Sequence, residues 1–352
     1  MGLMSPLSPI SRSRLPSPGE RQLLEKLVAC HGTPGDEAEV AAVLLQEWHA
    51  AGWATARHGP YAISARHPAA SHRRHPTLLL CAHMDAPGFV VDQIGRATLG
   101  LVPLGAIQAA DGETFATSLK TRTGRHPLTL RKLPAHAPGQ RDRYVATLPA
   151  TAAATTVTLG DRACFDTPPV FRPRDGHLAA PFLDNRLGCL LLTMLARELP
   201  ATGRAWNVVL GATACEELGG FGAPVLAAAS RPDLVLCLDA TYEAPKMGVR
   251  LGRGPVLTVT DASVLLSPAV RDTLRDWAAA RGLPLQLEAY NYSGTDSKAF
   301  PLHGLPAPVL PLLLPTRGNH TPREEARWCD LRALADLILA FVQSPPAALA
   351  RP

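Results

Sequence analysis

Beyond residue 181 the chain alternates between short apolar runs, typical of buried strands, and longer segments with the apolar spacing of a helix. The segments expected to be helices are 185–199, 222–229, 268–281 and 330–342. The runs expected to be strands are 206–213, 234–238, 256–260, 285–290 and 307–310. Strands that alternate with helices form a mostly parallel sheet with helices on both faces, so the pattern predicts an α/β fold.

The same architecture begins near the N-terminus. Ser17-Pro18-Gly19-Glu20 has the residues of a helix start, and this helix would bury one apolar face made of Leu23, Leu24, Leu27 and Val28. A second helix is expected over 36–51, followed by strands at 53–58, 61–66 and 77–82. We expect residues 1–16 to form a disordered lead.

The pattern of apolar and polar residues changes between residues 98 and 175. Helical spacing disappears there, and short alternating runs are separated by Pro, Gly and basic residues. This pattern is typical of a small all-β module. We therefore expect one α/β domain, formed by 17–97 and 176–345, that is interrupted by a β-rich insert over 98–175.

Charge and hydropathy exclude several classes of protein. The net charge is +5 at pH 7, but the basic run at 67–75 has no aromatic residues within it, so we expect no nucleic-acid partner. No apolar run approaches the ~18 residues of a membrane span. The N-terminus lacks the apolar core of a signal peptide.

The seven cysteines are odd in number and widely spaced, and no CxxC motif occurs. Several of them lie inside apolar runs, where a free cysteine behaves as a small core residue. This usage predicts a reducing compartment, and we expect the protein in the cytoplasm.

His83-Met84-Asp85 directly follows the apolar run 78–82. Residues i and i+2 of an extended chain point to the same side, so His83 and Asp85 can face one site. Asp85 would then orient the imidazole or approach a metal ion itself. The simpler alternative is a loop histidine paired with a surface aspartate.

More carboxylates and a second histidine lie at the ends of other strand-like runs or at the start of a helix, namely Asp184, Glu216, Glu217, Asp239 and His320. Each has a simple alternative, because Asp184 could cap helix 185–199 and the others could lie in exposed loops. So many such residues at successive strand ends favour one shared site, since the carboxyl ends of parallel strands meet at one edge of a sheet.

Two imidazoles and several carboxylates at one sheet edge can hold two divalent metal ions and leave a carboxylate free as a base. Zn²⁺ or Co²⁺ suits histidine and carboxylate ligands without thiolates, and Mn²⁺ is a third candidate. No GxSxG, HExxH or GxxxxGK[ST] motif occurs in the chain. The sequence therefore favours metal-assisted hydrolysis.

In this order, the residues resemble the motifs of the glutamyl/deblocking (TET-type) dinuclear metallo-aminopeptidases, some of which are labelled cellulase- or endoglucanase-like. The matching motifs are His83-Met84-Asp85, Leu183-Asp184-Asn185-Arg186, Glu216-Glu217-Leu218-Gly219, Asp239-Ala240-Thr241, Gly294-Thr295-Asp296 and His320-Thr321-Pro322. The resemblance covers roughly residues 20–343 and implies a zinc-peptidase-like α/β fold with its β insert in this place.

The resemblance also implies a ligand set for two metal ions. Asp184 would bridge them. His83 and Asp239 would complete one metal site, and Glu217 and His320 would complete the other.

For the reaction, the resemblance implies that Glu216 is the general base and that Asp85 supports the first metal site by orienting its histidine. Gly294, Thr295 and Asp296 would line the substrate pocket. The implied partners are peptide substrates and further copies of the chain, because the insert of this family usually serves oligomer assembly and access control.

The implied activity is hydrolysis of the N-terminal peptide bond of peptides. Another dinuclear metal amidohydrolase, such as a deacetylase or a carboxypeptidase-like enzyme, is the main alternative, followed by a non-catalytic relative. Departures from the family pattern, such as Ala86-Pro87 after Asp85 and Ser297-Lys298 after Asp296, gather around the expected substrate contacts. We therefore expect the substrate preference to have diverged.

Overall fold

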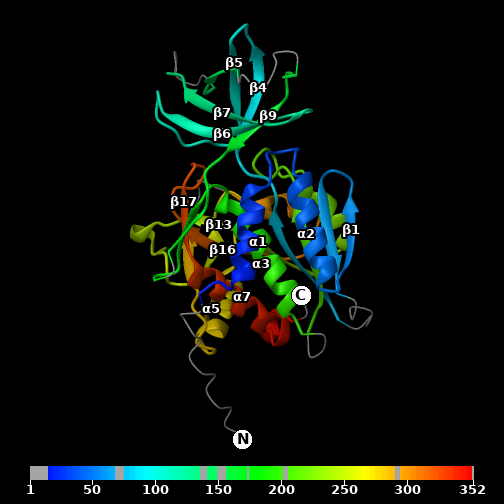
Figure 1. Ribbon diagram of the computed structural model, residues 1–352. Helices are drawn as coiled ribbons and strands as arrows, with labels where there is room; N and C mark the ends of the chain where they lie inside the picture. Colours follow the sequence, from blue (N-terminus) through cyan, green and yellow to red (C-terminus); the bar gives the residue numbers. More distant parts are fainter. Residues whose placement is uncertain are drawn as a thin grey trace, which may run out of the picture.

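The computed structural model describes residues 15–67, 75–134, 141–148, 156–172, 174–200, 205–289 and 294–350. The expected disordered lead lies outside the described residues as far as residue 14. Figure 1 shows an α/β body with a separate group of strands above it. Among the described residues, no helix is both long and apolar enough to cross a membrane.

The α/β body is built on an eight-stranded sheet of order β1-β2-β12-β3-β13-β16-β14-β15. Its four central strands, β12, β3, β13 and β16, run parallel, whereas β1, β2 and β14 add antiparallel pairs. The expected mostly parallel sheet is confirmed at this centre. The strands are β1 Ala54–His58, β2 Ala62–Arg66, β3 Thr77–His83, β12 Asn207–Thr213, β13 Leu234–Tyr242, β14 Val256–Thr260, β15 Gln286–Ala289 and β16 Val309–Thr316.

Helices cover both faces of this sheet. Alternate strand residues point to opposite faces, so each strand contributes side chains to a core on either side. On β3, Leu78 and Leu80 pack into the larger core with α1, α2, α3, α5 and α7, whereas Leu79 and Cys81 pack with α4 and α6. The helices are α1 Pro18–Ala29, α2 Ala38–Ala50, α3 Leu183–Glu198, α4 Gly222–Ser230, α5 Pro268–Ala279, α6 Ala299–Leu302 and α7 Trp328–Gln343.

Helix α1 begins where the sequence predicts it. The Ser17 hydroxyl accepts the backbone N–H of Glu20, and the Glu20 carboxylate accepts the N–H of Ser17. This reciprocal pair is a capping box, which satisfies two N–H groups at the helix end. The second expected helix begins only at Ala38, two residues later than predicted.

The separate group of strands is a closed barrel of order β4-β5-β8-β7-β6-β9 (Figure 1). Phe89, Phe115, Tyr144 and Phe165 fill its interior with edge-to-face and tilted ring contacts. The strands are β4 Gly88–Ile94, β5 Thr98–Leu104, β6 Thr114–Thr121, β7 Gly124–Lys132, β8 Tyr144–Thr147 and β9 Arg162–Phe165. The expected insert boundary at 98 is therefore wrong by one strand, because β4 pairs with β5 and β9 rather than with the large sheet.

A third, smaller sheet joins β10 Val170–Arg172, β11 His177–Ala180 and β17 Glu324–Arg327. Sequence patterns did not predict β17, which is only four residues long and contains three charged residues. It pairs with β11, the last strand before α3. This pairing brings the segment after His320 against the start of α3, where Asp184 lies.

Candidate metal centre

The expected ligand residues meet at the carboxyl ends of the central parallel strands. His83 is the last residue of β3, Glu216 and Glu217 follow β12, and His320 follows β16. Asp239 lies inside β13 rather than directly after it, because β13 stays paired with β16 as far as Tyr242. A pocket at this edge is lined by residues that include His83, Asp184, Glu216, Glu217, Asp239 and His320.

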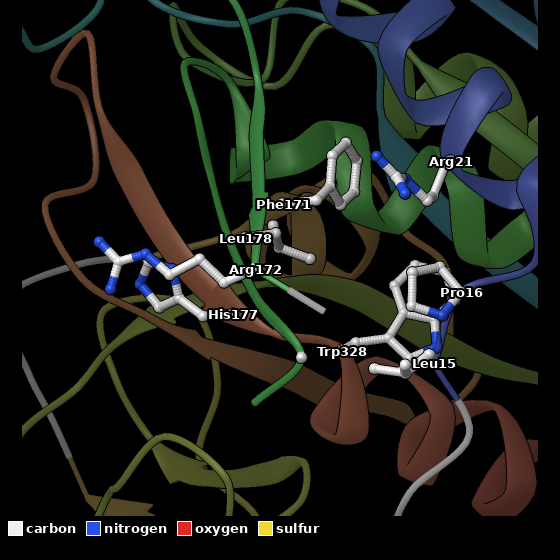
Figure 2. Close-up of a pocket in the computed structure, with 9 residues that line it drawn as sticks. Leu15, Pro16, Arg21, Phe171, Arg172, His177, Leu178 and Trp328 are labelled. Carbon is white, nitrogen blue, oxygen red and sulfur yellow. The ribbon is translucent and has the colours of Figure 1, made fainter. Parts of the chain in front are cut away.

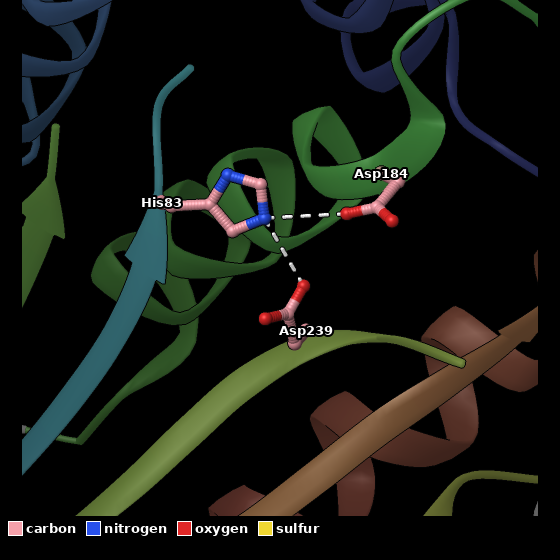
Figure 3. A group of neighbouring side chains, drawn as sticks. All are labelled: His83, Asp184 and Asp239. Carbon is pink, nitrogen blue, oxygen red and sulfur yellow. Dashed lines mark hydrogen bonds and ion pairs between the residues drawn. The ribbon is translucent and has the colours of Figure 1, made fainter. Parts of the chain in front are cut away.

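The first cluster joins His83, Asp184 and Asp239 (Figure 3). His83 Nε2 lies 3.2 Å from Asp184 Oδ1 and 3.2 Å from Asp239 Oδ1. The other ring nitrogen, Nδ1, lies 3.1 Å from the main-chain oxygen of Asp85 and is placed to donate its hydrogen there. When the imidazole is neutral, this tautomer leaves a lone pair on Nε2 beside two carboxylate oxygens, which is an arrangement of three donors for a cation.

The second cluster joins Asp184, Glu217 and His320. His320 Nε2 lies 3.4 Å from Glu217 Oε1 and 3.5 Å from Asp184 Oδ2. The two oxygens of Asp184 therefore face different histidines. Among the described residues, no hydrogen-bond donor serves the buried Glu217 Oε1.

Clustered carboxylates raise one another's pKa when no cation separates them. Burial, with Asp184 nearby, raises the pKa of Asp239 to about 6. Burial also raises the pKa of Glu216 and of Glu217 well above the ordinary range, and neighbouring carboxylates add to both shifts. Cations bound between the carboxylates would offset this mutual repulsion.

The histidines have the opposite effect on Asp184. Burial alone would raise the pKa of this carboxyl, but hydrogen bonds from His320 and His83 outweigh burial and lower it. Burial likewise disfavours the charged form of His83, whereas Asp239 and Asp184 raise the pKa of the imidazole well above its usual value. Asp184 therefore stays ionised, which the expected bridging role would require.

Asp85 faces the expected histidine and also has two backbone partners. Its carboxylate lies 3.6 Å from His83 Nδ1, farther away than its own main-chain oxygen. The two carboxylate oxygens accept the backbone N–H groups of Glu216 and Glu217, at 3.0 and 3.1 Å. Asp85 thus supports the segment that carries the expected base, while its main chain orients the histidine.

Sequence reasoning missed Glu324, which is almost fully buried. Its carboxylate accepts the backbone N–H of Asp184 and that of His320, both at 2.8 Å. It thereby links one ligand from each cluster. The signal in the sequence was a carboxylate four residues after His320, but only the pairing of β17 with β11 brings it to Asp184.

The three residues expected to line the substrate pocket differ in whether they face the cavity. Gly294 lines the pocket at the metal-type cluster, but Thr295 and Asp296 are buried. Asp296 accepts a hydrogen bond from the Thr213 hydroxyl at the end of β12, and burial raises its pKa to about 7. Only Gly294 of this segment therefore faces the cavity.

A second hollow lies beside α1, β10 and β11 (Figure 2). The Arg21 guanidinium lies 4.7 Å from the centre of the Phe171 ring there, and Trp328 forms another wall. None of the expected ligands lines it. Its histidine, His177, is paired with Glu325 at 3.2 Å, so the hollow offers no comparable group of metal ligands.

Solved structures show the same fold. A TET aminopeptidase from a marine-sediment Thaumarchaeota archaeon superimposes with a TM-score of 0.84 at 21% identity, over 94% of this chain and 99% of that one. A dodecameric TET1 structure, PhTET1-12s, superimposes with a TM-score of 0.78 at 20% identity, over 92% of this chain and 98% of that one. The expected fold class is confirmed.

Sequence comparison identifies the family. Residues 65–337 match the profile of the M42 glutamyl aminopeptidases, which is most of the chain. The chain belongs to the M42 glutamyl aminopeptidase family, and the expected resemblance is confirmed.

Two relatives support the family assignment. The glutamyl aminopeptidase of Lactococcus lactis subsp. cremoris is 30% identical over 249 residues, which are 64% of this chain and 68% of the relative. A protein of Acetivibrio thermocellus named as an aminopeptidase is 31% identical over 191 residues, which are 53% of this chain but only 57% of the relative.

Proposed function

We propose that the protein is a two-metal aminopeptidase that hydrolyses the N-terminal peptide bond of peptides. The observation that carries the proposal is the position of Asp184, whose Oδ1 faces His83 and whose Oδ2 faces His320. A carboxylate in this position can bridge two cations. Membership of the M42 glutamyl aminopeptidase family supports peptidase chemistry at the site.

The residues present fit two divalent metal ions. One ion would be held by His83, Asp184 and Asp239, and the other by Asp184, Glu217 and His320. Glu217 Oε1, which is buried without a hydrogen-bond donor, would gain a partner in this way. Imidazole and carboxylate ligands without thiolates suit Zn²⁺ or Co²⁺, and Mn²⁺ also fits.

When bound, the two ions would lower the pKa of a water molecule and polarise the scissile carbonyl. Glu216 lines the same cavity and also forms a possible ligand group with His83 and Glu217, but it belongs to neither of the two sets that share Asp184. We assign Glu216 as the general base, which takes a proton from the attacking water and delivers a proton to the leaving amine. Asp85 holds the amides of Glu216 and Glu217 and so fixes the direction of both side chains.

The substrate class follows from the acidic character of the cavity. A free α-amino group is a cation at neutral pH, and carboxylates beside the reacting bond would hold it there. This requirement would restrict cleavage to the first peptide bond. We propose that Gly294 approaches the substrate backbone and that Thr295 and Asp296 support it from behind.

We further propose that the protein acts as a homo-oligomer. PhTET1-12s, which has the same fold, is a dodecamer in its solved structure. The β barrel would contribute to assembly and to substrate access, because it forms a separate body joined to the α/β part (Figure 1). The cytoplasmic location stays a prediction.

The test is a panel of aminoacyl-anilides and short peptides, each with a free or an acetylated N-terminus, supplied with Zn²⁺, Co²⁺ or Mn²⁺. We expect cleavage of the free-amine substrates alone. Activity should disappear on chelation, and Glu216→Gln should lower kcat by ~10²–10⁴-fold while both ions stay bound. Cleavage of the acetylated substrates would instead favour another amidohydrolase, and two bound ions without any turnover would favour a non-catalytic relative.

A further inference from the structure

The segment after β12 is held by two carboxylates that come from different parts of the chain. Asp85 accepts the backbone N–H groups of Glu216 and Glu217. Glu37, from the segment just before α2, accepts the backbone N–H of Cys215 at 3.1 Å. Three successive amides of the segment that carries the expected base are therefore fixed from behind by buried carboxylate oxygens.

Cys215 has a backbone conformation that needs such support. Its φ of 58° lies in the left-handed region, which non-glycine residues adopt only where the surroundings enforce it. Its thiol also lies 3.6 Å from Glu37 Oε1, and its main-chain oxygen accepts the N–H of Gly220 at 2.7 Å. The turn that directs Glu216 into the cavity therefore begins at Cys215, whose amide and thiol both contact Glu37.

Glu37 is itself held firmly in place. Its side chain is 5% exposed, and Oε1 also accepts the N–H of Gly35 at 2.7 Å. The segment before it is tied to the barrel, because Lys120 pairs with Asp36 at 2.8 Å and Arg162 donates to the main-chain oxygen of Pro34 at 3.0 Å. The carboxylate is therefore a fixed point and not a mobile surface group.

We propose that Glu37 is a positioning residue for the reaction: it fixes the amide of Cys215 and thereby the direction of the Glu216 carboxylate. The inference rests on the proposed role of Glu216 as the base. It adds a residue that is not among those lining the cavity. Loss of the Glu37 carboxylate should lower kcat more than it changes KM, because the substrate contacts remain.

The kinetic test compares Glu37→Ala with Glu37→Gln. The alanine variant should lose ~10–100-fold in kcat, the cost typical of removing a supporting partner, with KM within about twofold of wild type. The glutamine variant keeps an acceptor oxygen for the Cys215 amide and should recover most of that loss. The matched control is Asp330→Ala, which removes a buried carboxylate that accepts the N–H groups of Gly252 and Gly254 away from the cavity. It should lower stability and leave kcat per folded molecule unchanged.

A second readout needs no turnover. Hydrogen–deuterium exchange of peptides covering residues 213–219, in metal-free protein without substrate, should be about tenfold faster in Glu37→Ala than in wild type and near wild type in Glu37→Gln. The Asp330→Ala control should leave this segment protected. Unchanged exchange in Glu37→Ala would overturn the inference, as would a loss of kcat that only follows the unfolded fraction. A wild-type protein that is silent on every substrate would refute the proposed function, and the exchange result would still decide the role of Glu37.

Discussion

The metal-free protein should lose stability as the pH rises from 5 to 7. Burial, with Asp184 nearby, raises the pKa of Asp239 from 3.8 to about 6 in the metal-free fold. When the pKa of a group is higher in the folded than in the unfolded state, the group contributes stability at pH values below its unfolded-state pKa. This contribution to the free energy of unfolding is lost as the pH rises through the folded-state pKa. For Asp239, linkage gives a loss of about 1.4 kcal/mol in the free energy of unfolding between pH 5 and pH 7.

The neighbouring groups do not reverse this slope. The pKa values of Glu216 and Glu217 are also raised by burial, so their contributions fall in the same direction as the pH rises. Hydrogen bonds from His320 and His83 outweigh burial and lower the pKa of Asp184, so its contribution is lost only at pH values below its ordinary range. Asp184 therefore adds no slope between pH 5 and pH 7.

Bound metal should reverse the slope, because protons compete with the ions for the same carboxylates. Free Zn²⁺ at ~1,000 times its Kd would add about 4.1 kcal/mol of stability, and this gain would shrink as the pH falls. The assay is urea unfolding of chelated and Zn²⁺-loaded protein at pH 5, 6 and 7, with Asp239→Asn as the control that removes the titrating group. A gain in stability of the chelated wild type from pH 5 to pH 7, relative to Asp239→Asn, would contradict the raised pKa of Asp239.

Three substitutions test other parts of the site. His320→Ala should leave one ion per subunit instead of two by elemental analysis, and retention of both ions would contradict the second cluster. Gly188→Ala would place a Cβ 2.8 Å from the Cβ of Ala82 and against Asn185 Oδ1. This overpacking should lower the free energy of unfolding, measured in urea, by ~1–3 kcal/mol. An unchanged unfolding midpoint would show that α3 can move to accept the methyl group. Glu324→Gln should weaken metal binding by ~10–100-fold in a competition with a chromogenic chelator, and unaltered affinity would remove its supporting role.

Much of the ligand set could be predicted from the sequence because of a general property of parallel sheets. Apolar runs mark the strands, and their carboxyl ends share one edge, so His83 and the Glu216-Glu217 pair fall together once the strands are recognised. The position of Asp239 was less accurate. Its strand continues for three residues after it, because pairing with β16 overrides the polar side chain.

The supporting carboxylates could not be predicted in the same way. Glu37 and Glu324 contact backbone N–H groups, which every residue carries, so no side-chain pattern marks their partners. Their positions depend on which loops lie against each other. The start of the barrel was missed for a related reason. The pattern of apolar and polar residues does not change between β3 and β4, and only the pairing of β4 with β5 and β9 assigns it to the barrel.

The proposed function depends most on Asp184 bridging two metal ions. The most direct measurement is anomalous diffraction from crystals of the Zn²⁺-loaded protein, collected on both sides of the zinc absorption edge. We expect two anomalous peaks ~3.5–4 Å apart, with one Asp184 oxygen ~2.0–2.2 Å from each. The first ion should also contact His83 and Asp239, and the second should contact Glu217 and His320. A single peak, or two peaks of which only one lies within bonding distance of Asp184, would contradict the claim.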